Sequence, residues 1–236
     1  SGESMIGKIF SIEIPRDGLH RRLGGGIPVG TITAIAGKHG SGKSAVVQRI
    51  LYGLLKNNYN VTYISTELTT KGLIDQMESL DYQIIEYLTS RHLLFIPVFP
   101  LIGKSIPRKD FLTRLMAARK LFETDVCIID TFSALVKDQL TPETAIEAMA
   151  FFKKIVAGGK AVVLTFESGE LTKEVENAIF SAVDILIEIE KSYGEGEIQR
   201  VMTITRYTNA QDYVGSVIGF RVEAKRGIIV DITTVA

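Results

Sequence analysis

One stretch of the chain decides its fold: Gly37-Lys38-His39-Gly40-Ser41-Gly42-Lys43-Ser44. It matches the spacing G-x-x-x-x-G-K-[ST], which is typical of loops that bind the phosphates of a nucleotide. The glycines allow backbone N–H groups to turn toward a phosphate, and the helix that follows adds the positive end of its dipole. In such a loop Lys43 reaches the β- and γ-phosphates, and the Ser44 hydroxyl binds Mg²⁺. The motif therefore predicts a site for a nucleoside triphosphate with Mg²⁺.

The segments on either side of this loop support the same interpretation. Residues 31–36 are apolar or β-branched and predict a buried strand, and residues 45–51 predict the first turns of a helix. The alternative is a glycine-rich turn that matches the motif by chance. We favour the phosphate loop because the signals for strand, loop and helix agree.

Length and composition place the chain among α/β proteins with one large core. Its 236 residues suffice for a single domain, which we expect over residues 5–236, with residues 1–4 as a tag remnant before Met5. No stretch approaches the roughly 20 apolar residues of a membrane span. The sole cysteine, Cys127, lies in an apolar run, so we expect it to pack rather than to react.

The charges balance, with 27 basic and 27 acidic residues. The chain thus lacks the positive field that drives non-specific nucleic-acid binding, and we expect no nucleic-acid partner. A local basic groove is the alternative. We favour the solvated face of an amphipathic helix for the basic residues in question, which are Arg108, Lys109, Arg114, Arg119 and Lys120.

Signals for strands and helices alternate along most of the chain, as in a parallel sheet flanked by helices. After residue 183 the pattern changes to pairs of strands joined by short turns, one of them at residues 194–196. The predicted fold class is α/β, with a mostly parallel twisted sheet and C-terminal antiparallel hairpins. Strands are expected at 31–36, 61–66, 93–99, 125–130, 160–166, 183–191, 199–205, 217–222 and 228–233, and helices from 45, at 69–80, from 107 through 121, and at 141–156.

A second part of the site is predicted at Asp130, which closes the apolar run 126–129. A carboxylate at the carboxyl end of a strand can hold the Mg²⁺ shell beside the phosphate loop. Asp is also common at the start of a turn, so a structural role is the alternative. We favour the metal role because the phosphate loop is independent evidence for a nucleotide.

Three further residues are candidates for a role in hydrolysing or sensing the γ-phosphate. Glu67 follows the strand at 61–66, where a carboxylate could orient or deprotonate the attacking water. A Glu at the start of a helix, stabilised there by the helix dipole, fits the sequence equally well. No Glu stands directly beside Asp130, which strengthens the case for Glu67. Arg206 ends a strand and could reach the γ-phosphate of a neighbouring subunit, although an exposed strand residue is the simpler alternative. Glu167 is a possible phosphate sensor or an ordinary surface residue.

These features together resemble the RecA-type ATPases, and within them the KaiC-like branch. The resemblance begins near residue 14 and is carried by Gly24-Gly25-Gly26-Ile27-Pro28-Val29-Gly30, the phosphate loop, Tyr63-Ile64-Ser65-Thr66-Glu67, Ile128-Ile129-Asp130-Thr131-Phe132-Ser133-Ala134-Leu135, Leu164-Thr165-Phe166-Glu167-Ser168 and Ile204-Thr205-Arg206-Tyr207-Thr208. It implies a RecA-like fold that binds ATP and Mg²⁺ and assembles into a ring, expected to be a hexamer. In that family Glu67 corresponds to the catalytic glutamate and Asp130 to the Walker B aspartate.

Length and loop sequence are most similar to the KaiC-like accessory ATPases of the archaeal flagellum (archaellum) motor. This resemblance implies contact with the motor ATPase and with membrane platform components. It also implies a cytoplasmic location that is peripheral at the cell membrane through those partners.

Two departures from KaiC predict weak chemistry. KaiC has two adjacent glutamates where this chain has Glu67-Leu68, and its trans-acting lysine corresponds to Ile204. We therefore expect a protein that binds ATP well, hydrolyses it slowly or not at all, and acts as a nucleotide-dependent assembly switch. The alternatives are an active RecA-like ATPase on single-stranded DNA and, ranked last, a KaiC-like autokinase.

Overall fold

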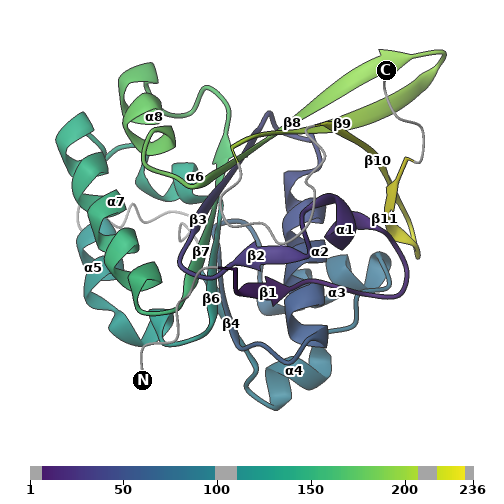
Figure 1. The fold of residues 1–236 in the computed structure, drawn as a ribbon, viewed down its shortest axis with the longest axis horizontal. Helices are drawn as coiled ribbons and strands as arrows, with labels where there is room; N and C mark the ends of the chain where they lie inside the picture. Colours follow the sequence, from purple (N-terminus) through teal and green to yellow (C-terminus); the bar gives the residue numbers. More distant parts are fainter. Residues whose placement is uncertain (1–6, 99–110, 207–216, 232–236) are drawn as a thin grey trace.

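The core of the protein is a nine-stranded sheet, seen in a computed structural model that describes residues 7–98, 111–206 and 217–231 (Figure 1). The strand order is β11-β10-β9-β8-β3-β7-β6-β4-β5. Strands β8, β3, β7, β6, β4 and β5 run parallel, and β9, β10 and β11 add antiparallel pairs at one edge. The predicted α/β class, with its C-terminal hairpins, is confirmed. The strands are β3 (Ile32–Gly37), β4 (Val61–Ser65), β5 (Leu93–Pro97), β6 (Val126–Asp130), β7 (Ala161–Glu167), β8 (Ile185–Gly194), β9 (Glu197–Arg206), β10 (Val217–Glu223) and β11 (Gly227–Val230).

Helices cover both faces of the sheet (Figure 1). Alternate residues of a strand enter different cores: Ile35 of β3 packs on the side of the helix that follows the phosphate loop, and its neighbour Ala34 packs on the opposite side. Burial on both faces explains why these strands are continuous apolar runs. One face carries α2 (Lys43–Lys56), α3 (Thr70–Ser79) and α4 (Ile85–Thr89); the other carries α5 (Phe111–Ala117), the 3₁₀ helix η2 (Arg119–Phe122), α6 (Phe132–Val136), α7 (Pro142–Ala157) and α8 (Lys173–Phe180).

The helix starts follow the capping chemistry in the sequence. The Thr69 hydroxyl accepts a hydrogen bond from the Gly72 N–H, and the Thr141 hydroxyl accepts one from the Thr144 N–H. We expected a single helix through residue 121, and its predicted C-terminal end is wrong. Helix α5 ends at Ala117, and a 3₁₀ turn follows. Its expected start at residue 107 lies outside the described residues. The short helices α4, α6 and α8 were not predicted.

Strand β8 has two partners, and only one of them was predicted. It pairs antiparallel with β9 through the expected turn, where Glu195 and Gly196 have positive φ angles of 46° and 85°. It also pairs parallel with β3, the strand that leads into the phosphate loop. The β8–β9 hairpin therefore runs beside the loop before it extends away from the body of the molecule (Figure 1).

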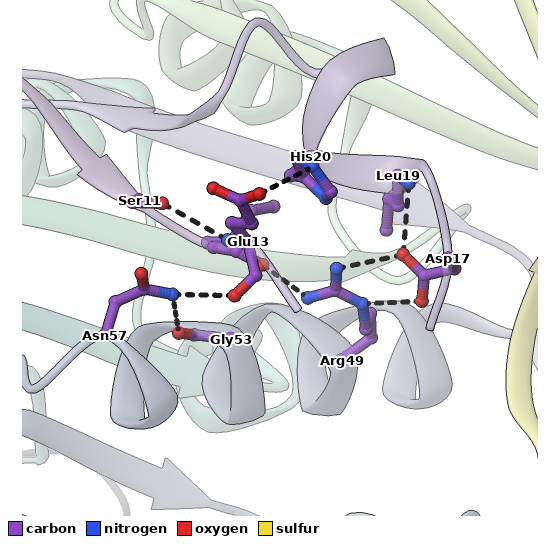
Figure 2. Close-up of polar contacts among 9 residues, drawn as sticks. Ser11, Glu13, Asp17, Leu19, His20, Arg49, Gly53 and Asn57 are labelled. Atoms are coloured by element: carbon purple, nitrogen blue, oxygen red, sulfur yellow. Dashed lines mark hydrogen bonds and ion pairs between the residues drawn. The ribbon is translucent and has the colours of Figure 1, made fainter. Parts of the chain in front are cut away.

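The segment before the phosphate loop is fastened to α2 by a buried ion pair (Figure 2). Arg49 of α2 donates to both carboxylate oxygens of Asp17, over 2.8 and 2.9 Å, and to the Ile12 carbonyl over 2.8 Å. Both side chains are almost fully buried, at 0% and 5% exposure. The segment also contains β1 (Ile9–Ser11) and β2 (Gly26–Pro28), which pair with each other, and α1 (Leu19–Arg22).

No helix within the described ranges has the length and apolar character that crossing a bilayer requires.

Candidate functional site

The phosphate-loop motif lies where the sequence predicted it, between β3 and α2. Gly40 and Gly42 have φ angles of +72° and +104°, a left-handed conformation that other residues adopt only with strain. Gly42 is the N-cap of α2, so the first N–H groups of this helix open into the loop. Ser44 lies half-buried in the first helical turn, next to Lys43. This is the backbone shape that an anion site at a helix N-terminus requires.

The Lys43 side chain folds back on the loop. Its ammonium group donates to the Gly37 carbonyl over 2.8 Å and to the Lys38 carbonyl over 3.0 Å, and the residue is 8% exposed. Burial lowers the pKa of Lys43, and the carboxylates of Glu167, Asp130 and Glu67 oppose this effect. The lysine is thus held at the loop by neutral carbonyls and faces acidic groups on one side. A phosphate is the anion that would satisfy it more fully.

Asp130 is fixed at the carboxyl end of β6. Its carboxylate accepts hydrogen bonds from the Tyr63 hydroxyl over 2.6 Å and from the Thr165 hydroxyl over 2.8 Å. Burial raises the pKa of Tyr63 well above its usual value, and the negative charge of Asp130 adds to the rise. The two hydroxyls orient the carboxylate and leave it lone pairs that can hold a metal-bound water.

Glu67 lies just past β4 and is exposed. Its backbone N–H donates to the Ser65 hydroxyl over 3.2 Å, which fixes the turn that carries it. The Glu67 charge is felt by Lys43, so β4, β6 and β7 bring Glu67, Asp130 and Glu167 to the same end of the sheet. This arrangement is the one that the rule for parallel sheets predicts.

Glu167 lies nearer to the centre of the site than its sequence position suggested. It exerts the largest charge effect on Lys43, and one of its carboxylate oxygens is 4.0 Å from His39 Nδ1 in the loop. Its neighbour Glu170, which sequence reasoning missed, has a raised pKa because it is partly buried and hydrogen-bonded to Glu167. Only the turn after β7 brings these two carboxyl groups together, and no motif in the sequence marks that turn.

Arg206 lies on β9, which is separated by β8 from the strand that leads into the phosphate loop. As the last residue of β9 it pairs with Leu186, near the start of β8, whereas the loop follows the far end of β3. Leu186 pairs in turn with Ala34, so the backbone of Arg206 is level with the middle of β3, three residues before Gly37, and one strand beyond β8. The backbone therefore keeps Arg206 away from the loop of its own chain, and its action on a neighbouring subunit stays a prediction.

The residues present fit a nucleotide with Mg²⁺. The Ser41 hydroxyl in the loop and the Arg200 Nε beside it are buried and lack a hydrogen-bond partner. Within the described ranges, no cluster of three or more His, Cys, Asp or Glu side chains could hold a metal by itself. Any Mg²⁺ here would take most of its ligands from phosphate oxygens and water, with Ser44 and Asp130 as the protein groups beside it.

Comparison with known proteins agrees with this geometry. A family model described as "ATPase: KaiC" matches residues 13–232. The archaeal flagellar ATP-binding protein FlaH of Methanocaldococcus jannaschii is 40% identical over 231 residues, which span 98% of this chain and 99% of that protein. FlaH of Methanococcus voltae is 36% identical, over 97% of this chain and 100% of that protein.

A solved structure is similar over the same length. The crystal structure of the flagellar accessory protein FlaH from Methanocaldococcus jannaschii superimposes with a TM-score of 0.90, covering 96% of this chain and 100% of that chain. The expected RecA-like fold is thereby confirmed. The chain belongs to the KaiC-like family of P-loop ATPases and, within it, groups with the archaeal flagellar ATP-binding proteins FlaH.

Proposed function

We propose that this protein is the ATP-binding subunit of an archaeal flagellum motor, that it hydrolyses ATP slowly or not at all, and that bound ATP switches its assembly. One observation carries the proposal. The hydrogen bonds that hold Lys43 at the loop and orient Asp130 support ATP binding, whereas Glu67 is the only carboxylate at the position of the family's catalytic glutamates, and it is exposed.

The chain has few of the charged groups that accelerate ATP hydrolysis in the family. Leu68 follows Glu67 where KaiC has a second glutamate, so a single carboxylate must position the water. Ile204, at the position of the family's trans-acting lysine, is 8% exposed and belongs to the apolar core. A charge supplied in trans is worth roughly 10³–10⁵ in the rate of related enzymes, so its loss favours binding over turnover.

The switch follows from what the γ-phosphate can hold in place. Glu167 and Asp130 end two different strands and Glu67 lies just past a third, and MgATP would connect these strand ends to the loop. An ordered subunit edge then favours a ring of copies, which we propose to be a hexamer, with Arg206 of each copy near the nucleotide of the next. The flagellar names of the relatives support a place in the flagellar machinery, which we propose to be beside the motor ATPase and its membrane platform on the cytoplasmic side.

Sedimentation of the purified chain tests the proposal, with no nucleotide, with MgADP and with MgATP. We expect MgATP to increase the assembled fraction in both the parent and the Glu67→Gln variant, because binding rather than hydrolysis drives assembly. Lys43→Ala is the control and should not respond. An unchanged particle size with MgATP would contradict the switch.

The same samples separate the main alternative. An ATPase acting on nucleic acid would turn over faster with single-stranded DNA, and Glu67→Gln would abolish that gain. We expect no stimulation by DNA in the parent or in the Glu67→Gln variant.

A further inference from the structure

Two cations of the β8–β9 hairpin lie against the phosphate loop without a counter-ion. They are Lys191 of β8 and Arg200 of β9, which are register partners across the hairpin. Neither residue forms an ion pair with any other residue that the structure describes, and the Arg200 Nε is buried with no hydrogen-bond partner. A buried guanidinium N–H without an acceptor is costly, so this position calls for an anion.

The hairpin aims both cations at the loop. On the face of β8 that enters the core beside α2, Ile187 and Ile189 are buried, and Lys191 is the next residue in that row. On β9 the corresponding row is Ile204, Met202 and then Arg200. The apolar stripe thus ends in two positive charges at the level where β3 gives way to the loop, since Gly37 pairs with Ile189.

Contact with the loop is close. A Cβ atom at Gly42 would lie 3.0 Å from Arg200 Cδ and 3.2 Å from Arg200 Nε. A Cβ atom at Gly40 would lie 3.1 Å from Lys191 Nζ. These glycines therefore serve two purposes, because they allow the left-handed turn and they leave room for the two cations.

Charges directly opposite each other on neighbouring strands repel when they have the same sign. Lys191 and Arg200 are such a pair, so the hairpin carries an electrostatic cost that a bound anion would relieve. The acidic groups lie on the other side of the loop, because β7, β6 and β4 follow β3 in the sheet whereas β8 and β9 precede it. The site therefore has an acidic side and a cationic side.

We propose that Lys191 and Arg200 bind the α- and β-phosphates of the nucleotide from within the same subunit. This inference rests on the proposed ATP site. It gives the bound nucleotide a direction: the terminal phosphate and Mg²⁺ lie toward Asp130, Glu67 and Glu167, and the nucleoside end lies toward the hairpin. ADP and ATP share the phosphates in question, so both depend on the two cations equally.

Nucleotide titrations of Arg200→Gln, Arg200→Lys and Lys191→Gln test the proposal, with MgADP and MgATP as the probes. We expect Arg200→Gln to weaken both nucleotides by about tenfold or more, as for the loss of a hydrogen bond to a charged group, and Arg200→Lys to lose less. The matched control is Arg221→Gln on β10, because Arg221 already has Glu223 and Asp231 as partners at 3.2 and 3.7 Å. It should leave both affinities within about twofold.

Thermal unfolding without nucleotide separates binding from mere support of the loop. Removing one of two repelling charges should leave the melting temperature of Arg200→Gln unchanged or raise it. A lower melting temperature with proportionate loss of affinity would show a packing role and overturn the proposal. A loss confined to ATP, or no greater than that of Arg221→Gln, would also overturn it. If Lys43→Ala still binds ATP as tightly as the parent, the proposed nucleotide site itself fails, which is a distinct result.

Discussion

At the scale of single residues, the Tyr63 hydroxyl determines how Asp130 is presented. Tyr63 is fully buried and donates to a carboxylate that is 5% exposed. Tyr63→Phe removes that donor and leaves a buried carboxylate with the Thr165 hydroxyl as its remaining strong partner. We expect the free energy of unfolding to fall by about 1.5–3 kcal/mol, measured by urea denaturation.

Tyr193→Phe is the matched control for this change. The Tyr193 ring is 81% exposed at the end of the hairpin, so losing its hydroxyl should alter stability by less than about 0.5 kcal/mol. Equal effects of the two variants would show that the hydrogen bond to Asp130 contributes nothing measurable.

Glu170 makes stability depend on pH in a defined direction. Its pKa in the folded protein is raised above the usual 4.5, first by burial and then by Glu167. The contribution of Glu170 to the stability of the fold is therefore fully present below pH 4.5, and it is lost as the pH rises through the pKa that Glu170 has in the folded protein. Glu170→Gln removes this loss, so the stability of the variant relative to the parent should increase from pH 4 to pH 7. A difference between variant and parent that is constant over this range would contradict the expected sign.

The sequence predicts the positions of candidate site residues where the signals lie close together along the chain. The loop 37–44 and Asp130 are recognisable because a strand, a turn and a helix follow one another within a few residues. Glu170, Lys191 and Arg200 are different, because their role depends on which turn or strand lies beside the loop. No local pattern contains that information, since it comes from the pairing of β8 with β3.

At the scale of elements, the Asp17–Arg49 pair fastens the N-terminal segment to α2 (Figure 2). Asp17→Ala leaves the Arg49 guanidinium buried with only the Ile12 carbonyl as a partner. We expect a loss of about 3–5 kcal/mol in the free energy of unfolding, because an uncompensated buried charge remains. Chemical denaturation with fluorescence detection measures it.

A double variant tests the physical reason. Replacing both partners, as Arg49→Met with Asp17→Leu, removes the charge together with its counter-ion and should cost less than Asp17→Ala alone. A double variant that is less stable than the single one would show that packing, rather than the buried charge, explains the loss.

Two long helices that begin at a capping threonine were predicted, whereas the short helices were not, even though α8 also begins at a capping threonine, Thr172. Thr69 and Thr141 mark the starts of α3 and α7, and their side chains make the expected hydrogen bonds. Helix α4 spans only Ile85–Thr89, which is too short for a periodic pattern, and tertiary packing decides whether such a segment is helical. Arg49 lies inside an apolar helix pattern, and only the crossing of residues 12–17 explains why a charge is buried there.

At the scale of the whole molecule, the position of Arg206 predicts an effect between subunits. Its backbone is level with the middle of β3, two strands across the sheet, and so lies short of the loop of its own chain. We expect Arg206→Ala and Lys43→Ala each to reduce MgATP-dependent assembly when tested alone. A mixture of the two should recover part of it, because the intact Arg206 of one chain can serve the intact loop of the other. Sedimentation of the mixture measures the recovery, and a mixture no better than the average of its components would contradict a role in trans.

The sequence predicts the class of the architecture, but it does not predict all of the strand pairings. Alternating strand and helix signals indicate a parallel sheet, and the turn at residues 194–196 indicates a hairpin. The sequence does not show that β8 joins the two parts by pairing with both β3 and β9. That connection places the hairpin beside the phosphate loop, and a strand's choice of neighbour depends on contacts distant in sequence.

Direct measurement of ATP affinity in the parent and in Lys43→Ala tests the central claim, which is that the loop before α2 binds the phosphates of ATP. The matched control is Lys56→Ala at the other end of the same helix. We expect the parent and Lys56→Ala to bind MgATP equally and Lys43→Ala to bind it at least about tenfold more weakly. Equal affinities in all three proteins would contradict the account.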